Sequence, residues 1–312
     1  MMIEQFRQCG YKAEAVELTA EELVAAQYGT VWTDPVIVEE SESAERRPAR
    51  ATFAPLQRVG GAYSGKFSGT FEPRPSGTDN TEPDWLQLLS AAGFSVTGDV
   101  ATWAAESVAS GVVGKSVTIK TRDGAYERTL AGARVSKLTF SAESGTTWKC
   151  EMEAVGRYSD AVQTAFLAAA HPSAGLAPVF LGTAVTIGGA NAPVSSVEIS
   201  VENTVTPSKD GTHASGYGRN VITESKAFFR ATVQEDGTTN WRDKARNDAA
   251  GDLLAITVVM GSGAAGYTQT WTGTITLSKQ PVVTYVEGIG YWQVEGEFMT
   301  ASSAAALTYT QS

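Results

Sequence analysis

Apolar and polar residues alternate with a period of two along most of the chain, which is the pattern of half-buried strands. The alternation is clear over residues 52–71, 117–122 and 126–130. Residues 134–140 and 147–155 also alternate and are separated by Ser144-Gly145, which predicts an antiparallel pair. The pattern resumes at residue 179 and continues to residue 299. Residues 52–71 predict two strands or a bent hairpin, with Gly60-Gly61 at the bend.

Three segments depart from this alternation and predict helices. Residues 81–93 carry Trp85, Leu88, Leu89 and Ala92 on one face, and Gly93 ends the segment. Thr19 and Glu22 form a capping-box sequence, which predicts a short helix before Gly29. Residues 240–250, closed by Gly251, predict a third helix. The Trp face of the first helix is expected to lie in the core rather than in a binding site.

The chain divides into four parts on these patterns. We predict an N-terminal arm over residues 1–50, a β domain over 51–165, a linker over 166–178 and a second β domain over 179–312. The apolar run Val36, Ile37 and Val38 predicts that the arm docks on another surface. The fold class is therefore mainly β with α, a β-sandwich or barrel-like fold with two tandem domains, each flanked by one helix.

The two β domains resemble each other in sequence order. One helix begins Asp84-Trp85 and the other Asn240-Trp241, and each ends in Ala-Ala-Gly. Tyr126 precedes Trp148 by 22 residues, and Tyr267 precedes Trp292 by 25 residues. These matches predict a duplicated domain. A heterologous contact that repeats around an axis closes a ring, and a duplicated chain needs half as many copies to do so.

Composition and charge narrow the function. The 312 residues carry a formal net charge of −10, which argues against specific binding of nucleic acid. Only Cys9 and Cys150 are present, and we expect free thiols. The charged first thirty residues do not form a signal peptide, and no apolar run has the roughly 20 residues of a membrane span, so we expect no membrane partner.

The sequence contains no motif that predicts catalysis. The histidines, His171 and His213, lack an accompanying nucleophile motif, and Gly216-Tyr217-Gly218 lacks the strand–loop–helix context of a phosphate site. We expect no enzyme activity, no cofactor and no metal. Residues 202–219 predict a long loop, which we interpret as a contact element.

The chain resembles the tail tube proteins of bacteriophages with long, non-contractile tails. The resemblance covers nearly the whole chain, although the helix around Trp241 is more charged than the first helix. The residues that carry it are 27–30 (QYGT), 65–71 (GKFSGTF), 83–89 (PDWLQLL), 131–140 (AGARVSKLTF) and 194–203 (VSSVEISVEN).

The resemblance implies a β-sandwich that self-assembles into stacked rings around a channel that conducts double-stranded DNA without binding it specifically. Three copies would give a pseudo-sixfold ring, and a hexamer is the alternative. The implied partners are the tape measure protein and the tail terminator and distal tail proteins. The implied location is the virion tail, after synthesis in the bacterial cytoplasm.

Two sets of residues are predicted to make contacts between subunits or rings. They are Val36, Ile37 and Val38 on the arm and Lys209, Asp210, Tyr217 and Arg219 in the loop. The alternative function is a cell-surface adhesive or carbohydrate-binding module. In that case Trp32, Trp103 and Trp271 would serve as exposed sugar platforms, while Trp85, Trp148 and Trp292 would lie in the core.

Overall fold

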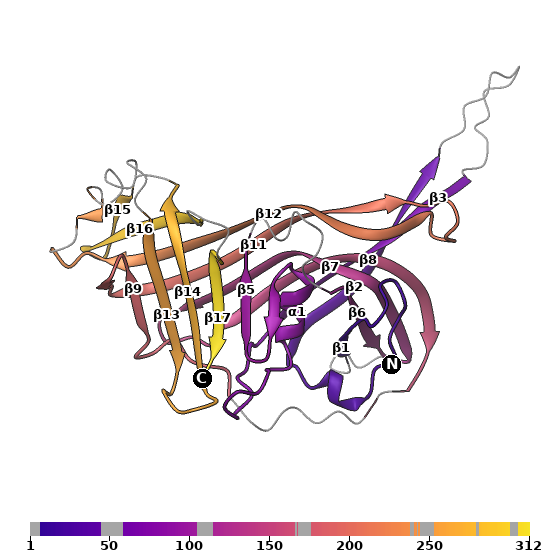
Figure 1. Cartoon of the computed structure of the whole chain (residues 1–312), viewed down its shortest axis with the longest axis horizontal. Coiled ribbons are helices and arrows are strands. Elements are labelled where there is room, and N and C mark those ends of the chain that lie inside the picture. Colours follow the sequence, from indigo (N-terminus) through magenta and orange to yellow (C-terminus); the bar gives the residue numbers. More distant parts are fainter. Residues whose placement is uncertain are drawn as a thin grey trace, which may run out of the picture.

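The computed structural model describes residues 7–44, 59–104, 115–165, 167, 176–237, 240, 241, 243, 253–278, 281–299 and 305–312. Within these residues the chain is mainly β, as predicted, and its strands pair antiparallel (Figure 1). The strands of the N-terminal half are β1 (Arg7–Ala13), β2 (Trp32–Ala44), β3 (Val59–Phe71), β4 (Ser95–Thr97), β5 (Val100–Trp103), β6 (Val117–Asp123), β7 (Tyr126–Glu143) and β8 (Lys149–Gln163). Those of the C-terminal half are β9 (Ala184–Ile187), β10 (Ala190–Asn191), β11 (Val194–Lys209), β12 (Tyr217–Gln234), β13 (Leu254–Gly261), β14 (Thr268–Leu277), β15 (Val282–Val286), β16 (Ile289–Phe298) and β17 (Leu307–Gln311).

Eight strands form one long run whose order is β2-β3-β8-β7-β11-β12-β16-β15. The pairing of β7 with β11 joins the two halves of the chain in this run. The expected pair of residues 134–140 with 147–155 is confirmed, since Phe140 lies opposite Cys150 and Val135 opposite Ala154.

The remaining strands lie on one side of the long run (Figure 1). There β1 pairs with β6, β9 with β13, and β17 with both β14 and β5. Together with helix α1 (Leu86–Ala91) they lie on the side of the long run where its apolar residues are buried, such as Cys150, Met152 and Ala154 of β8.

The core combines aromatic residues from both halves. The ring centroids of Trp85 and Tyr309 are 5.0 Å apart, and those of Phe140 and Trp271 are 4.9 Å apart. Trp148 stacks on Phe140 at 6.0 Å. Trp85, Trp148 and Trp292 are buried, as predicted. Aromatic pairs at these spacings add roughly 0.5–1.5 kcal/mol each beyond area burial.

The predicted helix of residues 81–93 is present but shorter. It is helical only over Leu86–Ala91, although Trp85, Leu88, Leu89 and Ala92 are buried as the periodicity required. Most of the helix predicted at residues 240–250 lies outside the described residues.

The N-terminal segment differs most from expectation. The helix predicted from Thr19 and Glu22 is absent, and only a 3-10 turn, η1 (Ala25–Tyr28), forms there. The segment is not a separate arm, because β1 pairs with β6 and β2 pairs with β3 along most of their lengths. Gly60 and Gly61 lie within β3 rather than at a bend. Tertiary strand pairing therefore outweighs the local helix signal.

The predicted loop at residues 202–219 is also wrong in its structure. Strand β11 runs to Lys209 and β12 begins at Tyr217, so only residues 210–216 form a turn. The predicted division into two domains stays a prediction, and residues 166 and 168–175 of the linker lie outside the described residues.

Candidate assembly surface

The long run of strands has one face that no other described element covers. We call it the polar face and define it by the outward positions of β2 (36–40), β3 (64–70), β8 (149–153), β7 (137–143), β11 (196–204), β12 (224–232) and β16 (291–297). It follows from strict alternation: in β8, Cys150, Met152 and Ala154 are buried, while Lys149, Glu151 and Glu153 are exposed. Three shallow hollows lie on this face.

The polar face carries nine carboxylates and five bases among these positions, so its net charge is −4 at neutral pH. The carboxylates are Glu40, Glu143, Glu151, Glu153, Glu198, Glu202, Glu224, Glu295 and Glu297, and the bases are Lys66, Lys137, Lys149, Lys226 and Arg230.

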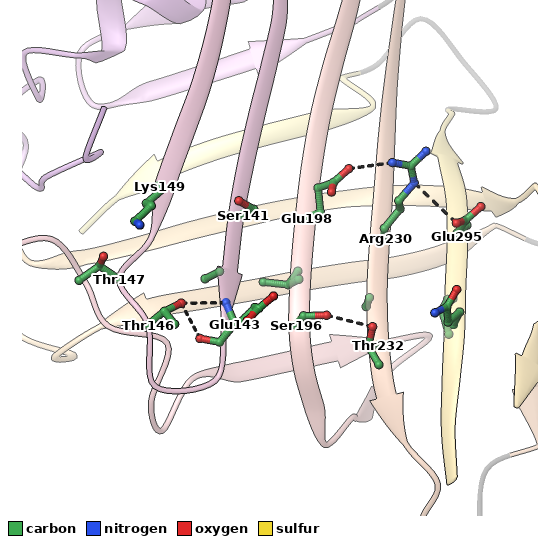
Figure 2. Close-up of a pocket in the computed structure, with 15 residues that line it drawn as sticks. Ser141, Glu143, Thr146, Thr147, Lys149, Ser196, Glu198, Arg230, Thr232 and Glu295 are labelled. Atoms are coloured by element: carbon green, nitrogen blue, oxygen red, sulfur yellow. Dashed lines mark hydrogen bonds and ion pairs between the residues drawn. The ribbon is translucent and has the colours of Figure 1, made fainter. Parts of the chain in front are cut away.

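Charged residues on neighbouring strands form rows across the polar face (Figure 2). Arg230 Nη1 lies 3.0 Å from Glu198 Oε1, and Arg230 Nε lies 3.7 Å from Glu295 Oε1. In another row Lys137 lies in register with Glu153 on one side and Glu202 on the other. Opposite charges in facing positions stabilise a sheet by roughly 0.2–1 kcal/mol per pair.

The bases on this face are therefore flanked by carboxylates rather than clustered. Lys226 Nζ lies 2.7 Å from Glu224 Oε1, and this hydrogen bond raises the pKa of the Lys226 ammonium above its usual value. Lys66 Nζ lies 2.8 Å from Glu40 Oε1. A phosphate group that approaches the face would meet an excess of negative charge, and Lys66, Lys226 and Arg230 are already paired with carboxylates.

Titratable groups with large pKa shifts lie away from the polar face. Burial raises the pKa of the Cys9 and Cys150 thiols, and both cysteines are free, as expected. Burial also raises the pKa of Tyr11 and of Tyr309, which lie in the core. These groups are structural, since none of them lies in a solvent-accessible cleft with a reactive partner.

The predicted contact residues fall into two groups. Val36 and Val38 point from β2 on the polar-face side, and Val38 is 54% exposed. Ile37 is buried, so its side chain is not available to a partner.

Lys209, Asp210, Tyr217 and Arg219 lie at the tip of the β11–β12 hairpin. Part of this tip already makes a contact within the chain: Tyr217 Oη donates a hydrogen bond to Glu42 Oε1 at 2.9 Å. Tyr63 N also donates to Ser215 O at 3.0 Å, so the tip rests on the β2–β3 hairpin.

The sugar-platform hypothesis is contradicted at two of its three residues. Trp103 and Trp271 are each only 1% exposed, and Trp103 Nε1 donates a hydrogen bond to Ser225 Oγ at 3.0 Å. Trp32 is half-buried and lies against Phe67 and Phe71. His213 is a surface turn residue whose Nε2 lies 3.7 Å from Asp210 Oδ2, and His171 lies outside the described residues.

The carboxylates of the polar face were not predicted from the sequence. The alternation Lys149-Cys150-Glu151-Met152-Glu153 shows that these charges leave the core, but it does not show which strands lie beside β8. This alternation could identify the exposed face of each strand. It could not show that seven strands present their charges on one continuous surface.

The fold and this surface define the class of protein: a mainly β protein with one large charged sheet face that no other described element covers. A family model described as phage tail tube protein matches residues 8–299 of the chain. The chain therefore belongs to the phage tail tube protein family, a family of structural proteins, and its place is the tail of the virion. No match was found among the curated proteins. None of the helices in the described part of the chain has the length and hydrophobicity needed to cross a bilayer.

Proposed function

We propose that this chain is the repeating subunit of a phage tail tube, that it assembles into stacked rings, and that the polar face lines the channel through which double-stranded DNA passes. The observation that carries this proposal is the continuous polar face with its net negative charge. The opposite face of the same strands packs on the core and is unavailable to a channel.

The charge suits conduction rather than binding. A channel rich in unpaired Lys and Arg would release counterions from DNA and hold it. On the polar face, Arg230 and Lys226 are already paired with carboxylates, and the remaining carboxylates repel the DNA backbone. At physiological salt this repulsion decays over roughly 8–10 Å, so it acts on DNA that passes within about that distance of the channel wall. No specific contact with DNA is required.

The ring would contain three copies if each chain supplies two equivalent units, and six copies is the alternative. The partners we propose for this tube are the tape measure protein and the tail terminator and distal tail proteins. Electron microscopy of the purified protein tests the assembly itself. Tubes or rings with a central channel support the proposal, and a protein that stays monomeric under all assembly conditions contradicts it.

Charge reversal tests the channel assignment. We expect that replacing Glu151, Glu153 and Glu202 by Lys in the phage leaves the tubes intact but slows DNA ejection at least several-fold, because the wall would then attract the backbone. The matched control replaces three exposed carboxylates outside the polar face, Glu22, Asp79 and Asp160, by Lys. Ejection at the native rate from intact triple-variant tubes would contradict the channel assignment.

A further inference from the structure

The strand pairings of the two halves follow one plan. In the N-terminal half β1 pairs with β6, β2 with β3, β3 with β8, β6 with β7, and β7 with β8. In the C-terminal half β9 pairs with β13, β11 with β12, β12 with β16, β13 with β14, and β14 with β16. Every pair is antiparallel and each has its counterpart in the same order along the chain.

Two long strands of the first half correspond to broken strands in the second. Leu277 of β14 lies opposite Gly296, and Val282 of β15 lies opposite Gln293, so β14 and β15 follow the same edge of β16. Together they correspond to β7, which follows one edge of β8. Likewise β16 and β17 together correspond to β8, since β17 pairs with β14 and β16 pairs with both β14 and β15.

The pairing at the outer edge of β7 has no counterpart within the described chain. The outer edge of β7 pairs with β11, the strand that begins the second half. Its counterpart would join the edge formed by the end of β14 and by β15 to a copy of β2, because β2 corresponds to β11. Within one chain these edges lie at opposite ends of the eight-strand run (Figure 1). Seven strand spacings of about 4.8 Å separate them by roughly 34 Å.

Both edges are open and carry apolar side chains. Among the described residues β2 pairs only with β3, and β15 pairs only with β16. Val282, Tyr285 and Val38 are 61%, 70% and 54% exposed. An exposed edge strand of this kind invites pairing with another chain.

We propose that the β14–β15 edge of one subunit pairs antiparallel with β2 of the next subunit, repeating between chains the β7–β11 pairing that joins the halves within each chain. The occupant of each edge is thus a second copy of this protein. The contact is heterologous, so its repetition around a single axis closes a ring in which neither β2 nor β15 remains an open edge. This assignment rests on the ring assembly proposed above and names its interface.

The internal pairing sets the register of this interface. Ser141 lies opposite Lys149 in the first half, and Val282 lies opposite Gln293 in the second. Lys149 and Gln293 each directly follow a buried Trp in the sequence. Val282 therefore takes the position of Ser141, whose partner on β11 is Glu198.

The counterpart of Glu198 on β2 follows from the neighbouring ladders. Glu198 lies opposite Arg230, which lies opposite Glu295. Thr33 lies opposite Thr70, which lies opposite Glu151. Since Glu295 and Glu151 each lie three residues after the buried Trp, Thr33 takes the place of Glu198. Val282 of one subunit should therefore face Thr33 of the next.

The neighbouring pair shows the apolar gain. One residue further, Val283 faces Trp32 in this register, in the place of Ala142 and Val197. Ala142 and Val197 are 5% and 2% exposed because their pairing is made within the chain. Val283 and Trp32 are only partly buried and pack against the core from the open edges. Pairing of two subunits would complete their burial.

Disulfide trapping tests the register in assembled protein. On mild oxidation the variant T33C/V282C should form a ladder of covalent multimers on non-reducing gels. Most of the protein molecules should be cross-linked. A one-to-one mixture of the T33C and V282C single variants should give covalent dimers and nothing larger. The native chain is the background control, since Cys9 and Cys150 are buried.

A matched control moves one cysteine along the same strand. Glu40 is exposed on β2, seven residues from Thr33, so E40C/V282C should remain monomeric under the same oxidation. Reduced variants are first checked for native circular dichroism and for tubes by electron microscopy. Tubes that form without T33C/V282C cross-links, or that cross-link equally in E40C/V282C, would overturn the β2–β15 interface while leaving the tube function in place. Absence of tubes in the native protein would instead count against the proposed function.

Discussion

A single buried carboxylate organises the N-terminal segment. Glu14, 5% exposed, follows β1, and its Oε1 accepts hydrogen bonds from Thr118 Oγ1 at 2.8 Å and Gly132 N at 2.6 Å. Its Oε2 accepts from Ser116 Oγ at 2.7 Å and Leu18 N at 2.9 Å. Gly132 has a φ of +61°, a left-handed conformation that favours glycine, and a Cβ there would displace the end of the Leu18 side chain, whose Cδ2 would lie 2.4 Å away. These contacts hold the segment after β1 against β6 and β7.

We predict that Glu14→Gln destabilises the subunit by about 1–3 kcal/mol, because an amide cannot accept four hydrogen bonds and would leave buried donors unpaired. Urea unfolding of the unassembled protein, followed by circular dichroism, measures the loss. Glu22→Gln is the control, since the Glu22 side chain is 95% exposed, and its effect should stay within about 0.5 kcal/mol. Equal stability of E14Q and the native chain would show that this carboxylate does not organise the segment.

At the scale of elements, the strand β11 is where the two halves of the chain meet. It pairs with β7 over Lys137 to Glu143 and with β12 along most of its length. Asn203 Nδ2 donates to Ala92 O and to Val135 O, each at 2.9 Å, so one side chain ties β11 to the end of α1 and to β7. Carbonyls at the end of a helix lack partners within the helix, and Asn203 supplies one. This contact adds to the burial of Leu86, Leu88 and Leu89, which packs α1 against the core.

Replacing Asn203 by an apolar residue of similar size tests how much its side-chain amide contributes to the stability of the subunit. We expect Asn203→Leu to lower the free energy of unfolding by about 1–3 kcal/mol, because two buried carbonyls would lose their donor. The exposed Asn191 of β10 offers a matched control, and Asn191→Leu should change stability by less than about 0.5 kcal/mol. The same urea titration serves for both, and a negligible loss in N203L would contradict the bridging role.

Local sequence signals were reliable where packing agreed with them and failed where it did not. The alternation in residues 134–155 predicted the β7–β8 pair correctly, because turn chemistry and hydrophobic pattern act on neighbouring residues. Gly211, Gly216 and Gly218 suggested a loop, yet they lie in or beside the short turn of a long hairpin whose strands are paired to β7 and β16 farther along. Long-range pairing of that kind leaves no local signature.

At the scale of the whole molecule, the two halves share one core. β17 from the C-terminus pairs with β5 from the first half, and Tyr309 packs on Trp85. Gln269 Nε2 donates to Pro73 O at 2.8 Å, which adds a buried hydrogen bond between the halves. The stability of each half therefore depends on contacts made by the other.

We predict that the unassembled subunit unfolds in one cooperative transition rather than two. Tryptophan fluorescence and far-ultraviolet circular dichroism should give the same midpoint in urea. Trp271→Ala, which removes a core side chain of the second half, should lower both midpoints together, with a loss of about 3–5 kcal/mol. Two separated transitions, of which only one moves in W271A, would mean that the halves fold independently.

The sequence by itself determined the mainly β class, the buried tryptophans of the strand and helix patterns, and the resemblance to tail tube proteins, because these depend on periodicity and on short runs of residues. Only the tertiary structure decided that residues 7–13 and 32–44 belong to the sheet, that carboxylates from six strands share one face, and that β2 and β15 are open edges. The physical reason is that a strand's alternation specifies which residues point outward but not which strands lie beside it. Pairing partners are chosen by contacts far apart in the chain.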